Sequence, residues 1–448
     1  METLDRLRAG KLAGIRRLDL KGGLTDFPRE ILDLADSLEV LNLTGNHLRS
    51  LPDDFARLHR LRILFCSDNE FTHLPPVLGR CPHLSMIGFK SNHIQTVEAS
   101  SLPESLRWLI LTDNRIRSLP STLGRCTRLQ KLMLAGNRLS HLPKEMAFCT
   151  RLELIRLAAN EFRALPPWLL SLPRLSWLSF AGNPCSSPIL TLPDFMPLIP
   201  WSSLQLQEKL GQGASGTIHR ARWHNRPASA DPHVAVKLFK ASVTSDGLPA
   251  CEMAVSLAAG THDHLIPVLG RLAQHPDGKE GLVMSLIDHS FTPLAAPPSF
   301  ETCTRDVYPE TIRFTPASAV SLAADVASAV CHLHSRGIMH GDLYAHNVLW
   351  HPQGRPVLGD FGAATSYPAH EVPLARALQG IEIRAFGCLL DELLHRIDWP
   401  PSQLPVAEGL LALQAQCTLP LVSNRPLFDE VERVLHSHLH DLESDEAA

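Results

Sequence analysis

Glycine, lysine and acidic residues stand in the second half of the 448-residue chain at spacings that could support phosphate chemistry. Gly211, Gly213 and Gly216 form a G-x-G-x-x-G motif, with Gln212 inside it and Ile218 just after it. A backbone without side chains can approach phosphate oxygens closely. The motif alone is weak, because dinucleotide-binding folds carry it too.

More polar residues follow in a fixed order. The run 234–237 (VAVK) predicts a buried strand that ends at Lys237, and Glu252 opens an apolar-periodic helical stretch, so the two can form an ion pair. The series is completed by Asp342, Asn347 and Asp360. Each residue taken alone is more often structural, so it is the series that indicates a catalytic site.

In this order the motifs resemble those of the eukaryotic-type protein kinase family, across about residues 204–437. Segment 381–394 is similar to the family's central C-lobe helix, and segment 417–431, with Arg425, to its closing segment. The resemblance implies an α+β bilobal domain that uses ATP and Mg²⁺ to phosphorylate protein serine or threonine.

The resemblance also implies a role for each residue. Lys237 would hold the α- and β-phosphates, oriented by Glu252, and Asp342 would take the proton of the acceptor hydroxyl. Asn347 and Asp360 would offer oxygen ligands to Mg²⁺. The nucleotide-binding residues that it implies are Gly211, Gln212, Gly213, Gly216, Ile218, Ala235, Lys237, Met284 at the gatekeeper position and Leu286 in the hinge. His340 would be the catalytic-loop histidine, with His332 and His334 as ordinary helix-end residues.

The sequence departs from the family around its activation loop. Gly341 stands where most members have an arginine that pairs with the phosphorylated loop. Only nineteen residues separate Gly362 from Glu382, which takes the place of the C-lobe helix aspartate. No clear A-P-E follows, although 369–371 (AHE) could be a remnant that pairs with Arg425. We therefore predict a kinase that needs no activation-loop phosphorylation, which only Thr365, Ser366 and Tyr367 are placed to refute.

The catalytic loop also lacks a positive charge. Tyr344 stands where Ser/Thr kinases carry a lysine, and His346 where tyrosine kinases place an arginine. Efficient turnover and Ser/Thr specificity are therefore open at this stage. Two alternatives are a small-molecule kinase, since aminoglycoside and choline phosphotransferases carry a similar loop, and a pseudokinase scaffold. The retained Lys237, Asp342 and Asp360 favour an active protein kinase.

A repeat fills the first part of the chain. The pattern L-x-x-L-x-L-x-x-N-x-L recurs with its asparagine at Asn46, Asn69, Asn92, Asn114, Asn137, Asn160 and Asn183. An imperfect copy at 15–24 has Gly23 in place of the asparagine, as in a terminal cap. Over about residues 10–190 this resembles the leucine-rich-repeat family, which implies an α/β solenoid with a parallel concave sheet and structural asparagines.

The outward-facing strand positions of this solenoid are unusually apolar. Trp108, Ile110 and Met133 lie at their centre, and contiguous exposed apolar area marks interfaces. We predict a protein-binding face at these three residues. The alternative is that the side chains cover one another and expose little area.

The domain boundaries follow from these patterns: a solenoid at 1–183, a proline-rich linker at 184–203, a kinase domain at 204–440 and an acidic tail at 441–448. The net charge of -4 gives no reason to expect nucleic acid, and we expect no membrane span because long apolar runs are absent. Without a visible signal peptide, and with cysteines that fit buried positions, a cytoplasmic location is expected. The Pro/Thr-rich segment 289–317 replaces the family's short helix after the hinge, and we predict a loop near the substrate entrance without a firm role for it.

Overall fold

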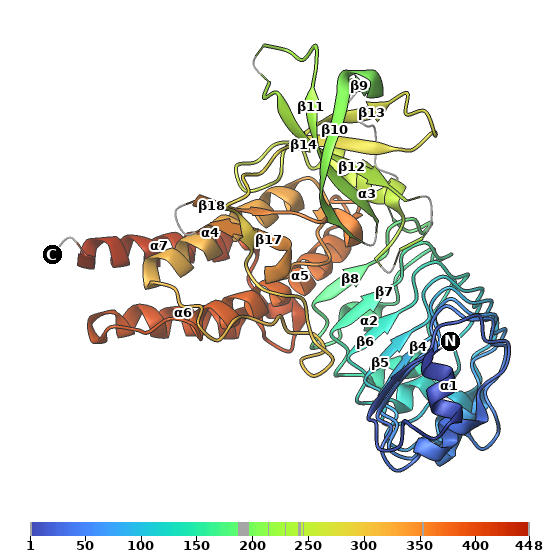
Figure 1. Ribbon diagram of the computed structural model, residues 1–448. Helices are drawn as coiled ribbons and strands as arrows, with labels where there is room; N and C mark the ends of the chain where they lie inside the picture. Colours follow the sequence, from blue (N-terminus) through green and yellow to red (C-terminus); the bar gives the residue numbers. More distant parts are fainter. Residues whose placement is uncertain are drawn as a thin grey trace. The chain divides into compact units, whose positions relative to one another are not determined.

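The computed structural model describes residues 2–186, 197–213, 215–228, 230–240, 243–244, 246–351 and 354–446 (Figure 1). The chain divides into two compact units. The first comprises Met1–Leu172 and Asn183–Cys185, and the second Pro173–Gly182 and Ser186–Ala448. This division differs from the predicted boundary at residue 183, because the segment Pro173–Gly182 of the last repeat packs with the C-terminal unit.

Short parallel strands follow one another in chain order through the repeats. After helix α1 (Glu2–Arg8) they are β1 (Arg17–Asp19), β2 (Val40–Asn42), β3 (Ile63–Phe65), β4 (Met86–Gly88), β5 (Trp108–Ile110), β6 (Lys131–Met133), β7 (Leu154–Arg156) and β8 (Trp177–Ser179). The connecting turns hold η1 (Arg29–Leu34), η2 (Phe55–Arg57), η3 (Pro76–Arg80), η4 (Ala99–Ser101), η5 (Ser121–Arg125), η6 (Lys144–Phe148) and α2 (Pro167–Leu170). The imperfect N-terminal copy thus forms a complete strand, β1, whose Arg17 pairs with Val40.

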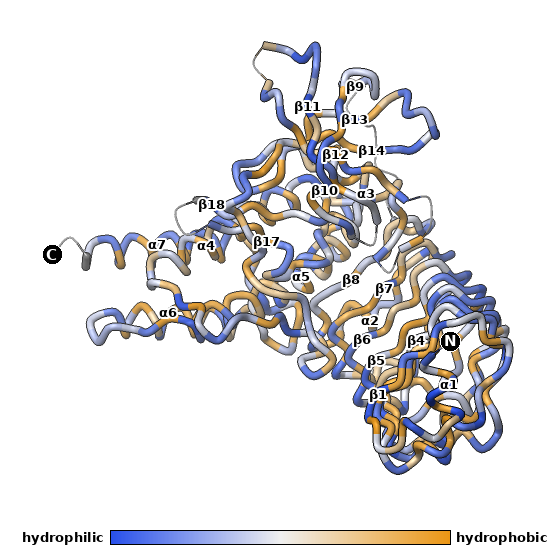
Figure 2. Tube along the Cα trace, viewed as in Figure 1, coloured by the Kyte–Doolittle hydropathy of each residue, from blue (hydrophilic) through white to orange (hydrophobic). Residues whose placement is uncertain are grey.

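Alternation along each strand separates the two faces of the sheet. The central residue points inward and is buried, as Leu41 and Leu109 are, while its neighbours point outward. Figure 2 shows apolar residues along the strands and hydrophilic residues at the turns. The predicted solenoid is confirmed.

The repeat asparagines hold neighbouring repeats together. The Asn137 side-chain oxygen accepts from the Ile116 amide at 3.0 Å, and its amide nitrogen donates to the carbonyls of Leu111 and Leu134 at 2.9 and 3.0 Å. Asn160 makes the same set of bonds one repeat later. These buried bonds satisfy backbone groups of turns that carry no regular ladder.

The second unit begins with a six-stranded sheet, in the order β10-β11-β12-β14-β13-β9. Its elements are β9 (Leu198–Pro200), η7 (Trp201–Ser203), β10 (Leu204–Gln212), β11 (Gly216–Trp223), β12 (His233–Phe239), α3 (Pro249–Ala258), β13 (Val268–Ala273) and β14 (Gly281–Ser285). Strand β9 belongs to the predicted linker, of which 187–196 lie outside the described residues. It pairs with β13 and buries Ile199 in the core of this sheet, so residues 198–203 are part of the domain.

A helical region completes the unit. Its helices are α4 (Pro316–Ser335), η8 (Ala345–Asn347), η9 (Phe361–Ala363), α5 (Val372–Leu394), η10 (Pro401–Gln403), α6 (Leu404–Cys417), η11 (Val422–Asn424) and α7 (Phe428–Glu446). Its short strands are β15 (Thr292–Pro293), β16 (Ile338–Met339), β17 (Val348–His351), β18 (Gly354–Leu358) and β19 (Thr365–Ser366). A mixed sheet followed by helices is the predicted α+β bilobal arrangement. Helix α7 runs to Glu446, so it takes in most of the predicted acidic tail.

Helix α4 is the one described helix long and apolar enough to cross a membrane by length and composition alone. It packs against α7, and 56% of its apolar window is buried inside the unit. Such burial is typical of the core helix of a folded domain. The helix therefore gives weak support to a membrane span.

Candidate active site

Lys237 and Glu252 form the ion pair that the sequence predicts. Lys237 lies on the central strand β12, Glu252 on α3, and the lysine Nζ contacts Glu252 Oε1. Both side chains are buried. Burial, with the negative charge of Asp360 nearby, raises the pKa of Glu252, and Lys237 acts in the opposite direction. The pair thus holds a lysine ammonium inside the domain, close to Asp360.

The three glycines of the β10–β11 hairpin differ in what surrounds them. A Cβ on Gly216 would lie 2.4 Å from the Leu238 carbonyl oxygen, so packing alone requires a glycine there. A Cβ on Gly211 or Gly213 would meet nothing within 4 Å. At these two positions the packing would accept a side chain, and its absence leaves open space for a ligand to approach the backbone.

The other predicted nucleotide residues lie on the same sheet. Ile218 of β11 pairs with Lys237, and Ala235 of β12 pairs with Met284 of β14. Leu286 follows the end of β14 and is half-buried, whereas Gln212 ends β10 and accepts a bond from Lys209 at 2.7 Å. The sheet register thus brings Ile218, Ala235 and Met284 next to the strand of the ion pair.

The catalytic loop presents Asp342 and Asn347 together. The Asn347 amide nitrogen donates to the Asp342 carbonyl at 2.8 Å and to its Oδ2 at 2.9 Å. Because the nitrogen is used in this way, the Asn347 side chain offers its oxygen on the other side. Asp360 stands in the left-handed region, φ +53°, and its Oδ1 accepts from the Gly362 amide at 3.1 Å. An amide oxygen and a carboxylate fit the ligand preference of Mg²⁺.

The carboxylate of Glu382, on α5, binds the backbone of this loop. It accepts from the backbone amides of His340 at 3.1 Å and Gly341 at 2.6 Å, and from His334 Nε2 at 2.7 Å. Although the residue is fully buried, His334 and His340, with the Gly341 amide, hold the pKa of Glu382 below its usual value. His334 lies in the last turn of α4, as predicted, but it also supplies a partner to this buried charge, which the sequence did not indicate.

Arg425 does not pair with the predicted 369–371 remnant. Its guanidinium donates to three backbone carbonyls, those of Leu419, Gly380 and Pro173, at 2.8 Å each. Burial lowers the pKa of Arg425 to about 10. This buried cation is satisfied by carbonyl dipoles, so the interpretation of Glu371 as its partner was wrong.

Segment 289–317 contributes Asp306 to the site, a residue that the sequence analysis did not single out. Its Asp306 accepts from the His346 amide at 2.9 Å and lies 2.8 Å from His346 Nδ1. Burial would lower the pKa of His346, but Asp306 reverses the effect and the pKa is raised. No sequence pattern marks Asp306 as a partner of the catalytic loop, because the contact joins segments 40 residues apart.

The outward face of the solenoid is less exposed than its composition suggests. Trp108, Ile110 and Met133 are all half-buried. The Lys131 ammonium lies 4.4 Å from the centre of the Trp108 ring, where it adds a positive charge to the predicted apolar face. Each side chain thus keeps some exposed surface, and the protein-binding face at these residues stays a prediction.

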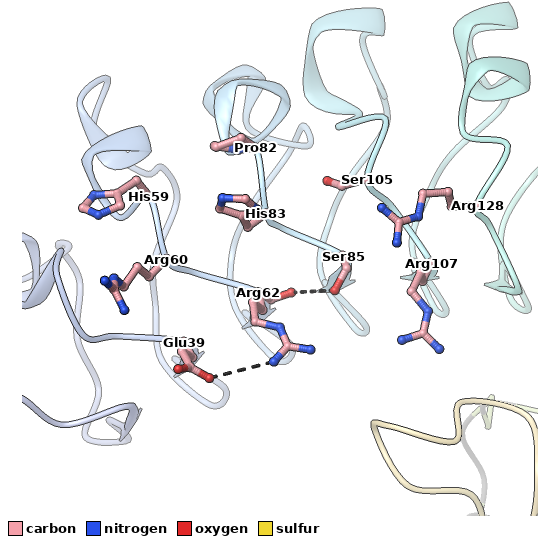
Figure 3. Close-up of a pocket in the computed structure, with 10 residues that line it drawn as sticks. All are labelled: Glu39, His59, Arg60, Arg62, Pro82, His83, Ser85, Ser105, Arg107 and Arg128. Carbon is pink, nitrogen blue, oxygen red and sulfur yellow. Dashed lines mark hydrogen bonds and ion pairs between the residues drawn. The ribbon is translucent and has the colours of Figure 1, made fainter.

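A basic groove lies on the solenoid (Figure 3). The groove has a volume of about 620 Å³ and is lined by Arg60, Arg62, Arg107, Arg128, His59 and His83, with Glu39 as the one acidic residue among the lining. Arg62 and Arg107 directly precede strands β3 and β5. The chain's slight negative net charge hides this local excess of arginine, so composition could not predict it.

Comparison with known proteins identifies both parts of the chain. A family model for "protein tyrosine and serine/threonine kinase" matches residues 204–384, and a leucine-rich-repeat model matches residues 37–58. Relatives include the serine/threonine-protein kinases PITSLRE of Drosophila melanogaster, 23% identical over 56% of this chain, and KIN28 of Saccharomyces cerevisiae, 25% identical over 47%. PkaA of Streptomyces coelicolor, also a serine/threonine-protein kinase, is 29% identical over 55%.

The matches cover different shares of those relatives. This chain spans 25% of PITSLRE, 69% of KIN28 and 48% of PkaA. The chain therefore joins leucine-rich repeats to a protein kinase domain.

Proposed function

We propose that this repeat-bearing protein kinase transfers the γ-phosphate of ATP, with Mg²⁺, to serine or threonine hydroxyls of proteins. The observation that carries the proposal is the pairing of a buried Lys237–Glu252 ion pair with an Asp342–Asn347 hydrogen bond in one kinase domain. The names of the relatives support serine and threonine as acceptors.

In this proposal Asp342 orients the acceptor hydroxyl and takes its proton. The acceptor oxygen forms a bond to the γ-phosphorus as the bond to the ADP oxygen breaks. Lys237, fixed by Glu252, holds the α- and β-phosphates, and the open backbone at Gly211 and Gly213 approaches them. Mg²⁺ bound by Asn347 and Asp360 would neutralise phosphate charge.

The test is phosphate transfer from labelled ATP by the purified full-length chain, comparing wild type with Asp342→Asn. Asparagine keeps the size of the side chain but cannot accept the proton, so we expect transfer to fall about 10²- to 10⁴-fold. Asp277→Asn, on the exposed hairpin before β14, is the matched control and should transfer normally. Transfer that is equal in the Asp342 variant, or absent from the wild type despite ATP binding, would reject the proposal.

We propose further that the solenoid recruits acidic protein segments. Leucine-rich repeats generally bind proteins, and here Arg107 of the groove directly precedes Trp108, the first residue of β5. A partner would place apolar side chains on the strands and its carboxylates or phosphates in the groove. A reducing, cytoplasmic location is also proposed, supported by ten cysteines that are all free thiols.

Binding of acidic peptides to the full-length chain tests this recruitment. Reversal of charge in Arg62→Glu with Arg107→Glu should weaken binding at least about tenfold at low salt and abolish its salt dependence. Trp108→Ala with Met133→Ser should weaken binding without changing the salt dependence. Arg163→Glu, exposed on the solenoid and outside the groove, serves as the control, and equal binding by all variants would exclude this face.

A further inference from the structure

A ten-residue piece of the last repeat is built into the catalytic unit. We refer to Pro173–Gly182, which contains strand β8, as the β8 segment. Five hydrogen bonds tie it to the rest of the unit, in the pairs Pro173–Arg425, Ser176–Arg384, Trp177–Leu343, Ser179–Asp246 and Phe180–Thr365. These partners lie before α3, in the catalytic loop, on β19, on α5 and before α7, so the segment bonds to five separate parts of the unit.

One of these contacts is on the catalytic loop itself. The Trp177 ring stacks on Tyr344 with centroids 4.2 Å apart and planes 6° from parallel. Its indole nitrogen donates to the Leu343 carbonyl at 3.0 Å. Trp177 is 1% exposed, and the Arg305 guanidinium lies 5.4 Å from the ring centre. Leu343 and Tyr344 directly follow Asp342, so Trp177 fixes the backbone next to the proposed base.

The β8 segment also accounts for the missing arginine. Gly341 has φ +74°, and a Cβ there would lie 2.6 Å from the Leu178 carbonyl oxygen and 2.8 Å from that of Ala363. Any side chain at residue 341 would displace the segment. Glycine is therefore required because β8 passes where an arginine side chain would begin.

The β8 segment also bonds to the short activation loop. The Thr365 hydroxyl is fully buried and accepts from the Phe180 amide at 3.2 Å. Tyr367 is 3% exposed, and burial raises its pKa to about 12. Arg425, whose expected partner was the end of the activation loop, donates instead to the Pro173 carbonyl.

We propose that the β8 segment replaces the activation segment of this kinase, and that Trp177 is the positioning residue that orders the catalytic loop around Asp342. The proposal rests on the proposed kinase function. Order that other kinases gain through loop phosphorylation is supplied here by a fixed piece of the last repeat. Activity should therefore persist, within about twofold, after phosphatase treatment of the full-length protein.

The test uses full-length protein with Trp177→Ala, Trp177→Phe and the control Trp168→Ala. Trp168 lies in α2, which precedes the β8 segment, and it takes no part in the five hydrogen bonds. We expect Trp177→Ala to lower kcat about ten- to a hundredfold with little change in the KM for ATP, because a shifted base impairs transfer but not nucleotide binding. Trp177→Phe, which keeps a ring but loses the indole bond, should fall between, and Trp168→Ala should match wild type.

Hydrogen–deuterium exchange provides a readout that does not need catalysis. In Trp177→Ala the amides of 340–347 should exchange at least about tenfold faster, while those of the solenoid stay unchanged. If wild type proves inactive, the proposed function fails, and faster exchange would still support the ordering role. If Trp177→Ala leaves both kcat and exchange unchanged, the proposal is overturned. A rise in kcat would also overturn it, because the segment would then be an inhibitor.

Discussion

The two compact units bury polar side chains in opposite ways. The solenoid buries one asparagine in each of its seven regular repeats, and each makes nearly the same bonds to backbone groups of its neighbours. The catalytic unit buries charges, each with a different set of partners: Lys237 with Glu252, Glu382 with His334 and two amides, Arg425 with three carbonyls. Uniform neutral bonds build a scaffold in which every repeat is equivalent. Buried charges that each have their own set of partners hold a few atoms in fixed positions, as a catalytic site needs.

The strongest test of this contrast is Lys237→Met. Methionine preserves most of the volume but leaves Glu252 buried without its cation, which costs about 3–5 kcal/mol of folding stability when the carboxylate is charged. Phosphate transfer should also fall at least about a hundredfold. Urea unfolding and labelled-ATP transfer measure the two effects.

The control for this variant is Lys279→Met, on the exposed hairpin before β14. Lys279 lies 3.8 Å from Asp277, and such surface pairs contribute less than about 1 kcal/mol. A Lys237 variant as stable as the Lys279 variant would show that the buried pair stabilises nothing. The contrast between the two units would then lose its main support.

Asn137→Ala tests the uniform asparagine bonds of the solenoid. It leaves the Ile116 amide and the carbonyls of Leu111 and Leu134 without the side chain that bonds them, at a cost of about 2–3 kcal/mol. Because every repeat is built alike, Asn160→Ala should cost nearly the same. Urea unfolding followed by exchange at the solenoid amides measures both. Costs that differ by more than about 1 kcal/mol would refute the equivalence of the repeats.

The same contrast explains what could be predicted from the sequence. The solenoid strands, the asparagine bonds and the Lys237–Glu252 pair follow from local patterns, a period of about 23 residues and an ordered set of motifs. The partners of His334, Arg425 and Asp306 do not, because each is selected by packing between segments distant in sequence.

Two tryptophans illustrate which contacts could not be predicted from the sequence. Trp108 and Trp177 hold the same position in the repeat pattern. Trp108 is half-buried beside Lys131, whereas Trp177 is fully buried on Tyr344. The repeat predicts that both begin a strand and point outward, but what an outward side chain meets depends on the rest of the fold. The β8 segment was therefore assigned to the solenoid from its sequence.

The smallest expected effect concerns two glutamates of α5 whose pKa values shift in opposite directions. Burial and the charge of Asp306 raise the pKa of Glu392 to about 8, whereas Glu382 has its pKa lowered by His334. Tyr308 donates to Glu392 at 3.2 Å.

A raised folded-state pKa means that the stability from protonated Glu392 is complete below about pH 4.5 and is lost as pH rises through 8. Glu392→Gln imitates the protonated form, so it should match wild type at pH 4.5 and be more stable than wild type above pH 8. Glu382→Gln should show the reverse sign, with a deficit at neutral pH that shrinks as pH falls below about 4.5. Melting temperatures from pH 4 to 9 measure both, and curves that run parallel to wild type would show that neither carboxyl is perturbed.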